Sequence, residues 1–174
     1  MTREIRSVAV IGGGTMGGGI AGAVAQAGFP VLLLESSRER AEKALDRIVN
    51  GRPPAVDDAD AASRIAIGTV DDDLDKIADY DWVCEAIVED LAAKRALFAR
   101  VEPLRKPGSV ISTNTSGIPL RTISEGMPDS FRRDVCVTHY FNPVKVMKLL
   151  ELVPDTDTDP AVIEALAAFN RAHL

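Results

Sequence analysis

Two side chains in this sequence could share and move a proton. His139 ends the apolar stretch CVTHYFNP, and Glu151 lies within the apolar stretch KLLELV. A carboxylate in such surroundings needs a partner, because burial otherwise raises its pKa until it becomes neutral. If the two stretches are neighbouring strands joined by NPVKVM, Glu151 faces His139, orients its ring and stabilises its protonated form. That arrangement makes the histidine a general base, although a purely structural pair would use the same residues.

A glycine-rich turn forms a second candidate site. Gly12, Gly14 and Gly17 have G-x-G-x-x-G spacing between an expected strand and an expected helix. The first glycine allows a tight turn, the second lets a pyrophosphate approach the backbone, and the third lets the helix pack against the strand. The first helical turn, which includes Thr15 and Met16, would present free N–H groups to phosphate. The pattern predicts a dinucleotide site; the alternative is a turn whose glycines only permit close packing.

Glu35 is the acidic residue expected to accompany this turn. It closes the next apolar stretch, roughly 20 residues beyond Gly14, where a carboxylate binds the adenosine ribose hydroxyls. A carboxylate there repels a 2′-phosphate, so NAD is favoured over NADP. Ser36, Ser37 and Arg38 follow directly and could accept a phosphate, which leaves the alternative open.

Further polar residues lie where two other apolar stretches end. In DWVCEAIVEDLAAK, Glu85 has apolar neighbours and is expected to be buried, whereas Asp90 is suited to capping a helix and Lys94 could be simply solvated. The segment STNTS, which contains Ser116, follows another apolar stretch and could serve a ligand or form a turn. In open α/β sheets, ligands gather at the carboxyl ends of strands. We therefore expect these residues at the same edge of the sheet as the glycine turn.

Apolar stretches and helical patterns alternate along the chain. This alternation predicts an α/β fold with a mostly parallel, doubly wound sheet and helices on both faces. The acidic segment DTDTDP is expected to cap the last helix, in which His173 is expected to be solvated or capping. The expected strands are 5–11, 31–35, 64–70, 81–88, 108–114, 134–141 and 148–153, and the expected helices are 15–27, 37–50, 91–104 and 161–173.

Composition limits the classes of function. The chain has 174 residues, of which 46% are hydrophobic and 26% charged, which suits one globular domain. Its net charge of −6 disfavours nucleic acid as a partner. No apolar stretch approaches the length of about 18 residues that a membrane span needs. Cys84 and Cys136 lie in apolar stretches and are expected to be core residues, neither a disulfide nor metal ligands, which suits a reducing compartment such as the cytoplasm.

Four motifs resemble one family. GGGTMGGGIA, CEAIVEDLAAK, STNTSGIPL and THYFNPVKVMKLLELV are similar, in this order and spacing, to the NAD-binding domain of the (S)-3-hydroxyacyl-CoA dehydrogenases of fatty-acid β-oxidation, and most similar to long bacterial multifunctional proteins. The resemblance implies a Rossmann-type fold and an acyl-CoA substrate. It implies His139 as the catalytic base, Glu151 as its partner and Ser116 as the group that binds the substrate oxygen. The implied NAD contacts are Gly12, Gly14, Thr15, Met16, Gly17, Glu35, Glu89, Lys94 and Asn142.

The sequence departs from the family pattern at several points. Gly117 stands where many members have a second serine, Tyr140 replaces a phenylalanine, and the expected loop SEGMPDSFRRD is long. The family continues into a helical domain, so residues 1–174 are expected to be the NAD-binding domain alone, which could self-associate through the surface that the helical domain would cover. The alternatives are a related NAD-dependent hydroxy-acid or carnitine-type dehydrogenase and an NAD-binding module without turnover.

Overall fold

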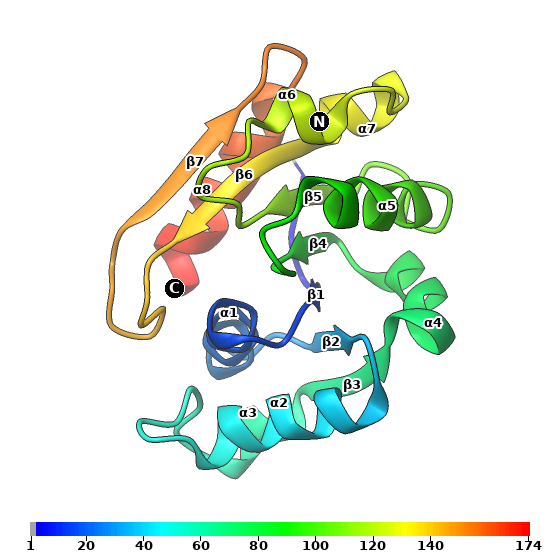
Figure 1. The fold of residues 1–174 in the computed structure, drawn as a ribbon. Coiled ribbons are helices and arrows are strands. Elements are labelled where there is room, and N and C mark those ends of the chain that lie inside the picture. The colour runs from blue at the N-terminus through cyan, green and yellow to red at the C-terminus, as the bar shows by residue number, and fades with distance from the viewer. Residues whose placement is uncertain (1–2) are drawn as a thin grey trace.

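The computed structural model describes residues 3–174 and is built around one seven-stranded sheet (Figure 1). Six strands are parallel, and the last is antiparallel to its neighbour. The order across the sheet is β3-β2-β1-β4-β5-β6-β7. The predicted α/β sheet is therefore confirmed. The strands are β1 (Val8–Ile11), β2 (Val31–Glu35), β3 (Ile65–Thr69), β4 (Trp82–Glu85), β5 (Val110–Thr113), β6 (Val135–Tyr140) and β7 (Leu150–Pro154).

Most strands are shorter than the apolar stretches from which they were predicted. The stretch that ends at Val88 shows the reason, because its ladder stops at Glu85. There the backbone N–H of Ile87 donates to the Glu85 side chain at 2.7 Å and not to a neighbouring strand. The same apolar stretch therefore supplies a strand and then a turn at the carboxyl edge of the sheet.

Successive strand residues face opposite sides of the sheet, and helices cover both sides (Figure 1). Val8 and Val10 pack under one group of helices, and Ala9 and Ile11 pack under the other. The first face carries α1 (Thr15–Gln26), α2 (Arg38–Asn50), α3 (Ala59–Ser63) and α8 (Pro160–His173). The second carries α5 (Leu91–Val101), α6 (Leu120–Ser124), α7 (Asp129–Asp134) and the 3₁₀ helix η1 (Leu74–Asp79), which follows the one-turn α4 (Val70–Asp73).

Side-chain caps fix where several helices begin. Ser37 accepts a hydrogen bond from Arg40 N–H at the start of α2, and Asp90 caps α5 in the same way. Asp159, in the acidic segment before α8, accepts from Ala161 N–H and confirms the predicted capping. Helices α3, α4, α6 and α7 were not predicted, and α7 lies inside the expected loop. At four to six residues each, they are too short to show a helical period.

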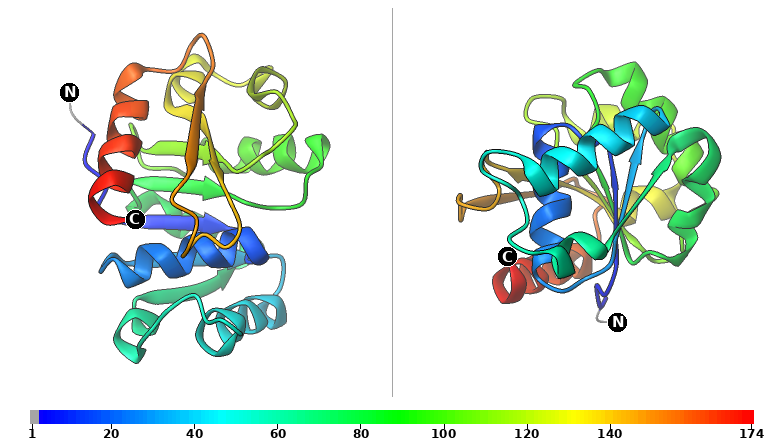
Figure 2. Two further views of the ribbon diagram at one scale, coloured as in Figure 1. Left: turned by 90° about the vertical axis from the view of Figure 1, so that its left-hand side faces the viewer. Right: turned by 90° about the horizontal axis from the view of Figure 1, so that it is seen from below.

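The antiparallel pair at one end of the sheet brings two distant residues together. In the register of β6 and β7, His139 is directly opposite Glu151. The connection between these strands runs down to α1 (Figure 2, left), where Val144 contacts Gly19. This connection therefore places residues 141–149 beside the helix that follows the glycine turn.

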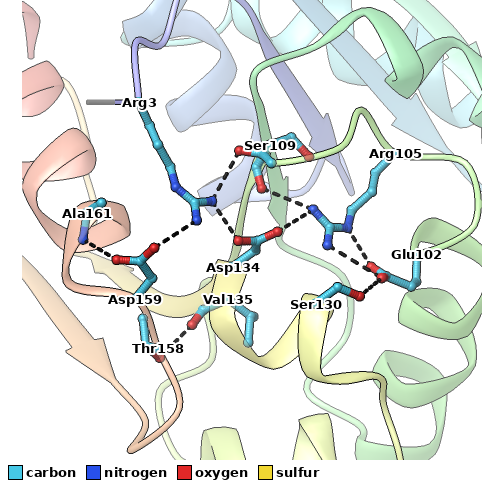
Figure 3. A network of polar contacts seen from close by, with 11 residues as sticks. Arg3, Glu102, Arg105, Ser109, Ser130, Asp134, Val135, Thr158, Asp159 and Ala161 are labelled. Atoms are coloured by element: carbon cyan, nitrogen blue, oxygen red, sulfur yellow. Dashed lines mark hydrogen bonds and ion pairs between the residues drawn. The ribbon is translucent and has the colours of Figure 1, made fainter. Parts of the chain in front are cut away.

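A network of charged residues holds together the opposite, amino edge of the sheet (Figure 3). Asp134 accepts from Arg3 at 2.7 Å and from Arg105 at 2.8 Å. Arg105 also pairs with Glu102, and Arg3 with Asp159. The network thereby joins the segment before β1 to the C-terminal ends of α5 and α7 and to the start of α8. None of the helices between residues 3 and 174 is long and apolar enough to cross a bilayer.

Close packing at the glycine turn predicts a contrast between two substitutions. A Cβ at Gly17 would lie 1.8 Å from the carbonyl oxygen of Gly12, whereas a Cβ at Gly14 would meet nothing within 4 Å. We expect Gly17→Ala to lower the melting temperature by more than about 4 °C, because overpacking costs roughly 1–3 kcal/mol or more. Gly14→Ala should change stability by less than about 1 kcal/mol, the size of an N-cap effect. Thermal unfolding of both variants measures the contrast, and equal losses would contradict it.

Candidate functional site

The candidate site is a cavity of about 980 Å³ at the carboxyl ends of the strands. It opens where α1 leaves β1 toward one face and α5 leaves β4 toward the other, so the chain diverges around it. This divergence is the switch point at which open α/β sheets bind ligands. Of the predicted site residues, ten line the cavity: Gly12, Gly14, Thr15, Met16, Glu35, Glu89, Lys94, Ser116, His139 and Asn142.

The glycine turn has the geometry that its spacing predicts. Gly12 has φ of +102°, a left-handed conformation that disfavours other residues, and a Cβ there would lie 2.5 Å from the carbonyl oxygen of Ala86. Gly17 lies behind the turn and not on the cavity wall, and its missing side chain lets α1 approach Gly12. These two glycines therefore permit close backbone packing.

Gly14 differs from its neighbours because no protein atom requires it to be glycine. It lines the cavity, and a Cβ on it would project into open space. It is also the N-cap of α1 and offers no side chain to the free N–H groups of the first turn. An uncapped helix N-terminus with an unobstructed approach suits a phosphate group. The turn therefore fits the pyrophosphate of a dinucleotide.

Glu35 is held firmly at the end of β2. It is 7% exposed and accepts hydrogen bonds from the backbone N–H of Gly13 at 2.8 Å and of Ser36 at 2.9 Å. Burial alone would raise the pKa of Glu35, but these N–H groups and Arg40, whose Nε lies 3.1 Å from the carboxylate, hold it below its ordinary value. The carboxylate is therefore fixed and ionised on the cavity wall. The sequence offers Arg38 as a cation near this position, but the cation that reaches Glu35 is Arg40, one helical turn beyond Ser37.

His139 and Glu151 form the predicted pair. His139 Nδ1 lies 2.8 Å from a carboxylate oxygen of Glu151. The geometric prediction is confirmed, but the expectation of a buried carboxylate is wrong, because the Glu151 side chain is 52% exposed. Strand β7 is the edge of the sheet, and in the described residues no helix covers this side chain. With Nδ1–H donating to Glu151, His139 keeps Nε2 free to accept a proton.

Ser116 is carried by a short turn that Glu89 supports. A carboxylate oxygen of Glu89 accepts from the backbone N–H of Ser116 at 3.2 Å and of Gly117 at 3.3 Å, and also from the Thr115 hydroxyl. Burial raises the pKa of Glu89, but the Thr115 hydroxyl and the charge of Lys94 hold it below its ordinary value. Asn114 accepts from Tyr140 N–H at 3.0 Å, which ties the start of this turn to β6.

The expectation that Lys94 is simply solvated is wrong. Its side chain is 1% exposed, and its ammonium lies 2.7 Å from Glu85 and 3.3 Å from Glu89. The local sequence AAKRALF gives no sign of this, because the two carboxylates reach Lys94 from the preceding strand and loop. As predicted, Glu85 is buried, at 0% exposure. The other expected core residues, Cys84 and Cys136, are buried free thiols.

Tyr140 lines the cavity without having been predicted as a site residue. Tyr140, beside His139, is buried and donates its hydroxyl to Asn170 at 2.6 Å; burial raises its pKa well above the ordinary value. The second histidine, His173, is exposed at the end of α8, as expected, and its ring packs at an angle against the rings of Phe29 and Phe169, with centroids 4.7 and 5.2 Å away. It lies outside the cavity.

Comparison with known proteins assigns this architecture to a family. The model of the "3-hydroxyacyl-CoA dehydrogenase, NAD binding domain" matches residues 7–173. A probable 3-hydroxyacyl-CoA dehydrogenase of Deinococcus radiodurans is 42% identical over 173 residues, covering 95% of this chain and 50% of the relative. A putative fatty acid oxidation complex trifunctional enzyme of Rickettsia felis is 36% identical over 176 residues, covering 97% of this chain and 24% of the relative.

A solved structure supports the same assignment. The crystal structure of 3-hydroxybutyryl-CoA dehydrogenase from Escherichia coli K12 superposes with a TM-score of 0.85 at 33% identity, covering 97% of this chain and 36% of that one. The chain thus spans from about a quarter to half of the length of these three relatives. The family model, the curated relatives and the solved structure each match nearly the whole chain. The chain therefore belongs to the family of NAD-binding domains of the 3-hydroxyacyl-CoA dehydrogenases.

Proposed function

We propose that this chain supplies the cofactor site and the catalytic base of an enzyme that oxidises a (S)-3-hydroxyacyl-CoA to the 3-oxoacyl-CoA. The observation that carries the proposal is that His139, hydrogen-bonded to Glu151, lines the same cavity as the glycine turn. A proton acceptor and a dinucleotide-binding turn in one cavity suit alcohol oxidation. The family to which the chain belongs supports the substrate class.

In the proposed reaction, His139 takes the hydroxyl proton of the substrate at Nε2. Glu151 accepts the hydrogen bond from Nδ1–H, fixes this tautomer and stabilises the imidazolium that forms. The Ser116 hydroxyl holds the substrate oxygen as it changes from alcohol to carbonyl. NAD, when bound, supplies the acceptor for the hydride that leaves C3. Proton and hydride together account for the two-electron oxidation.

The remaining predicted residues have proposed roles in binding the cofactor. Gly12, Gly14 and the first turn of α1, with Thr15 and Met16, would hold the pyrophosphate, and Gly17 would act by packing. Glu35 would accept from the adenosine ribose. Glu89, Lys94 and Asn142 would lie toward the nicotinamide end. All except Gly17 line the cavity, which supports these assignments.

We also propose that residues 1–174 act as the cofactor domain of a two-domain active site located in the cytoplasm, where the buried thiols of Cys84 and Cys136 stay reduced. A helical domain would cover the face that carries the half-exposed Glu151. Four apolar residues of the β6–β7 connection and of β7 are 42–63% exposed: Val146, Met147, Leu149 and Val153. Such an apolar surface favours association with a partner domain or, without one, with a second copy of the chain.

The position of Glu35 predicts a preference for NAD over NADP. Its carboxylate would repel a 2′-phosphate, and Glu35→Ala removes that repulsion while leaving Arg40 and the Ser36 N–H free to bind phosphate. We expect the substitution to weaken NAD binding and to reduce the difference in affinity between NAD and NADP. Titration calorimetry of the wild type and the variant measures both affinities. Equal or tighter binding of NADP than of NAD by the wild-type chain would contradict the assignment.

The proposed activity is tested with a chimera. We would fuse this chain to the part of the Deinococcus radiodurans relative that follows the matching region, and measure NADH formation from (S)-3-hydroxybutyryl-CoA. The chimera should be at least ~100-fold faster than the chain alone. Correct orientation of the substrate can lower the barrier by roughly 7–11 kcal/mol, and a chain that lacks about 3 kcal/mol of this contribution reacts more slowly by that factor. His139→Gln in the chimera is the matched control and should abolish turnover. Equal rates with and without the fused part would show that residues 1–174 are a complete enzyme.

Self-association has its own test. We expect sedimentation velocity to show a concentration-dependent dimer, and Val146→Glu with Leu149→Glu to shift it to monomer. Leu104→Glu is the control, since this residue is 37% exposed but follows α5 at the amino edge of the sheet. A wild-type chain that stays monomeric at all concentrations would overturn this part of the proposal.

A further inference from the structure

Glu85 occupies the centre of the carboxyl edge of the sheet. It is the last residue of β4, pairs with Ile11 on one side and with Thr113 on the other, and is completely buried. One carboxylate oxygen accepts from Lys94 Nζ and from Ile87 N–H, each at 2.7 Å. The other accepts from the Thr113 hydroxyl at 2.5 Å. The carboxylate is thus fully hydrogen-bonded although no solvent reaches it.

One branch of contacts leads from Glu85 through Lys94 to the Ser116 turn. The Lys94 ammonium lies between two carboxylates, 2.7 Å from Glu85 and 3.3 Å from Glu89. Glu89 in turn accepts from the backbone N–H groups of Ser116 and Gly117 at 3.2 and 3.3 Å. Lys94 therefore bridges Glu85 to the carboxylate of Glu89, which accepts hydrogen bonds from the turn.

A second branch reaches the same turn through β5. The Thr113 hydroxyl donates to Glu85 and accepts from the N–H of Thr115 at 3.3 Å. The backbone carbonyl of Glu85 also accepts from the N–H of Asn114 at 2.8 Å. Both branches therefore start at Glu85 and end within residues 114–117.

We propose that Glu85 is a positioning residue that holds the Ser116 hydroxyl in place at the cavity through Lys94–Glu89 on one side and Thr113–Thr115 on the other. Its importance for catalysis rests on the function proposed above for Ser116, whereas its effect on the turn does not. Glu85 itself does not line the cavity, so it acts through the residues that do.

The chemistry of the cluster favours positioning over stability as the reason for the charge. Two carboxylates share one ammonium, and burying such ionisable groups costs more than packing apolar side chains of similar volume. A carboxylate that accepts from three donors from different segments fixes those segments relative to one another. An apolar residue at the end of β4 would pack there without ordering the Ser116 turn.

The test measures backbone order of the ¹⁵N-labelled 174-residue chain by NMR relaxation, with no cofactor present. In the wild type, the amides of Ser116 and Gly117 should have order parameters near the rigid value of about 0.85. Glu85→Gln keeps the shape and removes the charge, and should lower both values toward the flexible range below about 0.6. The double variant Glu85→Gln/Lys94→Met also removes the buried ammonium, which Glu89 alone would hold after the first change; it should recover melting temperature but not the order of the turn.

Asp134→Asn is the matched control. It is the same acid-to-amide change at a buried carboxylate held by two arginines at the opposite edge of the sheet (Figure 3), so it should lower stability without loosening the Ser116 turn. If Glu85→Gln does not fold, Glu89→Gln at the half-exposed end of the first branch must loosen the same two amides. Unchanged order in Glu85→Gln or Glu89→Gln, or equal loosening in Asp134→Asn, would overturn the proposal. A wild-type chain that fails to bind NAD would instead refute the proposed function, and it would leave the conclusion that Glu85 orders the Ser116 turn intact.

Discussion

The close approach of α1 to the end of β1 is the constraint on which the site depends. Gly12 turns the chain with a positive φ, and the missing side chain of Gly17 lets the helix start against the Gly12 carbonyl. Because the turn also packs against Ala86, the first helix begins at the junction of β1 and β4 and not beyond it. The positive end of α1 therefore lies where the helices that follow β1 and β4 diverge to opposite faces of the sheet. Side chains at these positions would clash with the backbone of Ala86 and of Gly12 and would force the helix away from the turn.

The chemical groups reach this cavity from the other half of the sheet. Strand β6 brings His139 to the same carboxyl edge, and the antiparallel return of β7 places Glu151 directly opposite. The turn after β5 adds Ser116, and Glu85 links that turn to the strand beside the glycines. The glycine turn and the His139–Glu151 pair are thus fixed to strands of the same sheet, with β4 and β5 between β1 and β6.

The sequence predicts most of this architecture because the decisive signals are local. Glycine spacing, the acid that ends β2 and the histidine that ends β6 can each be recognised within a short stretch. The errors concern burial, which depends on residues distant in sequence. Lys94 looked solvated because its partners come from β4 and the following loop, and Glu151 looked buried because an apolar stretch does not reveal that its strand is at the edge. The role of Glu85 as the meeting point of two branches could not be predicted, since it depends on the pairing of β4 with β5.

The central claim is that one cavity at the carboxyl edge combines NAD binding with the His139 base. Amide chemical-shift mapping during a titration with NAD tests it most directly. We predict saturable shifts at the glycine turn, Glu35, the 114–117 turn and His139, with none at the Arg3–Asp134–Arg105 network on the opposite edge. Shifts confined to that network, or shifts at the glycine turn that leave His139 and Ser116 unaffected, would contradict the account.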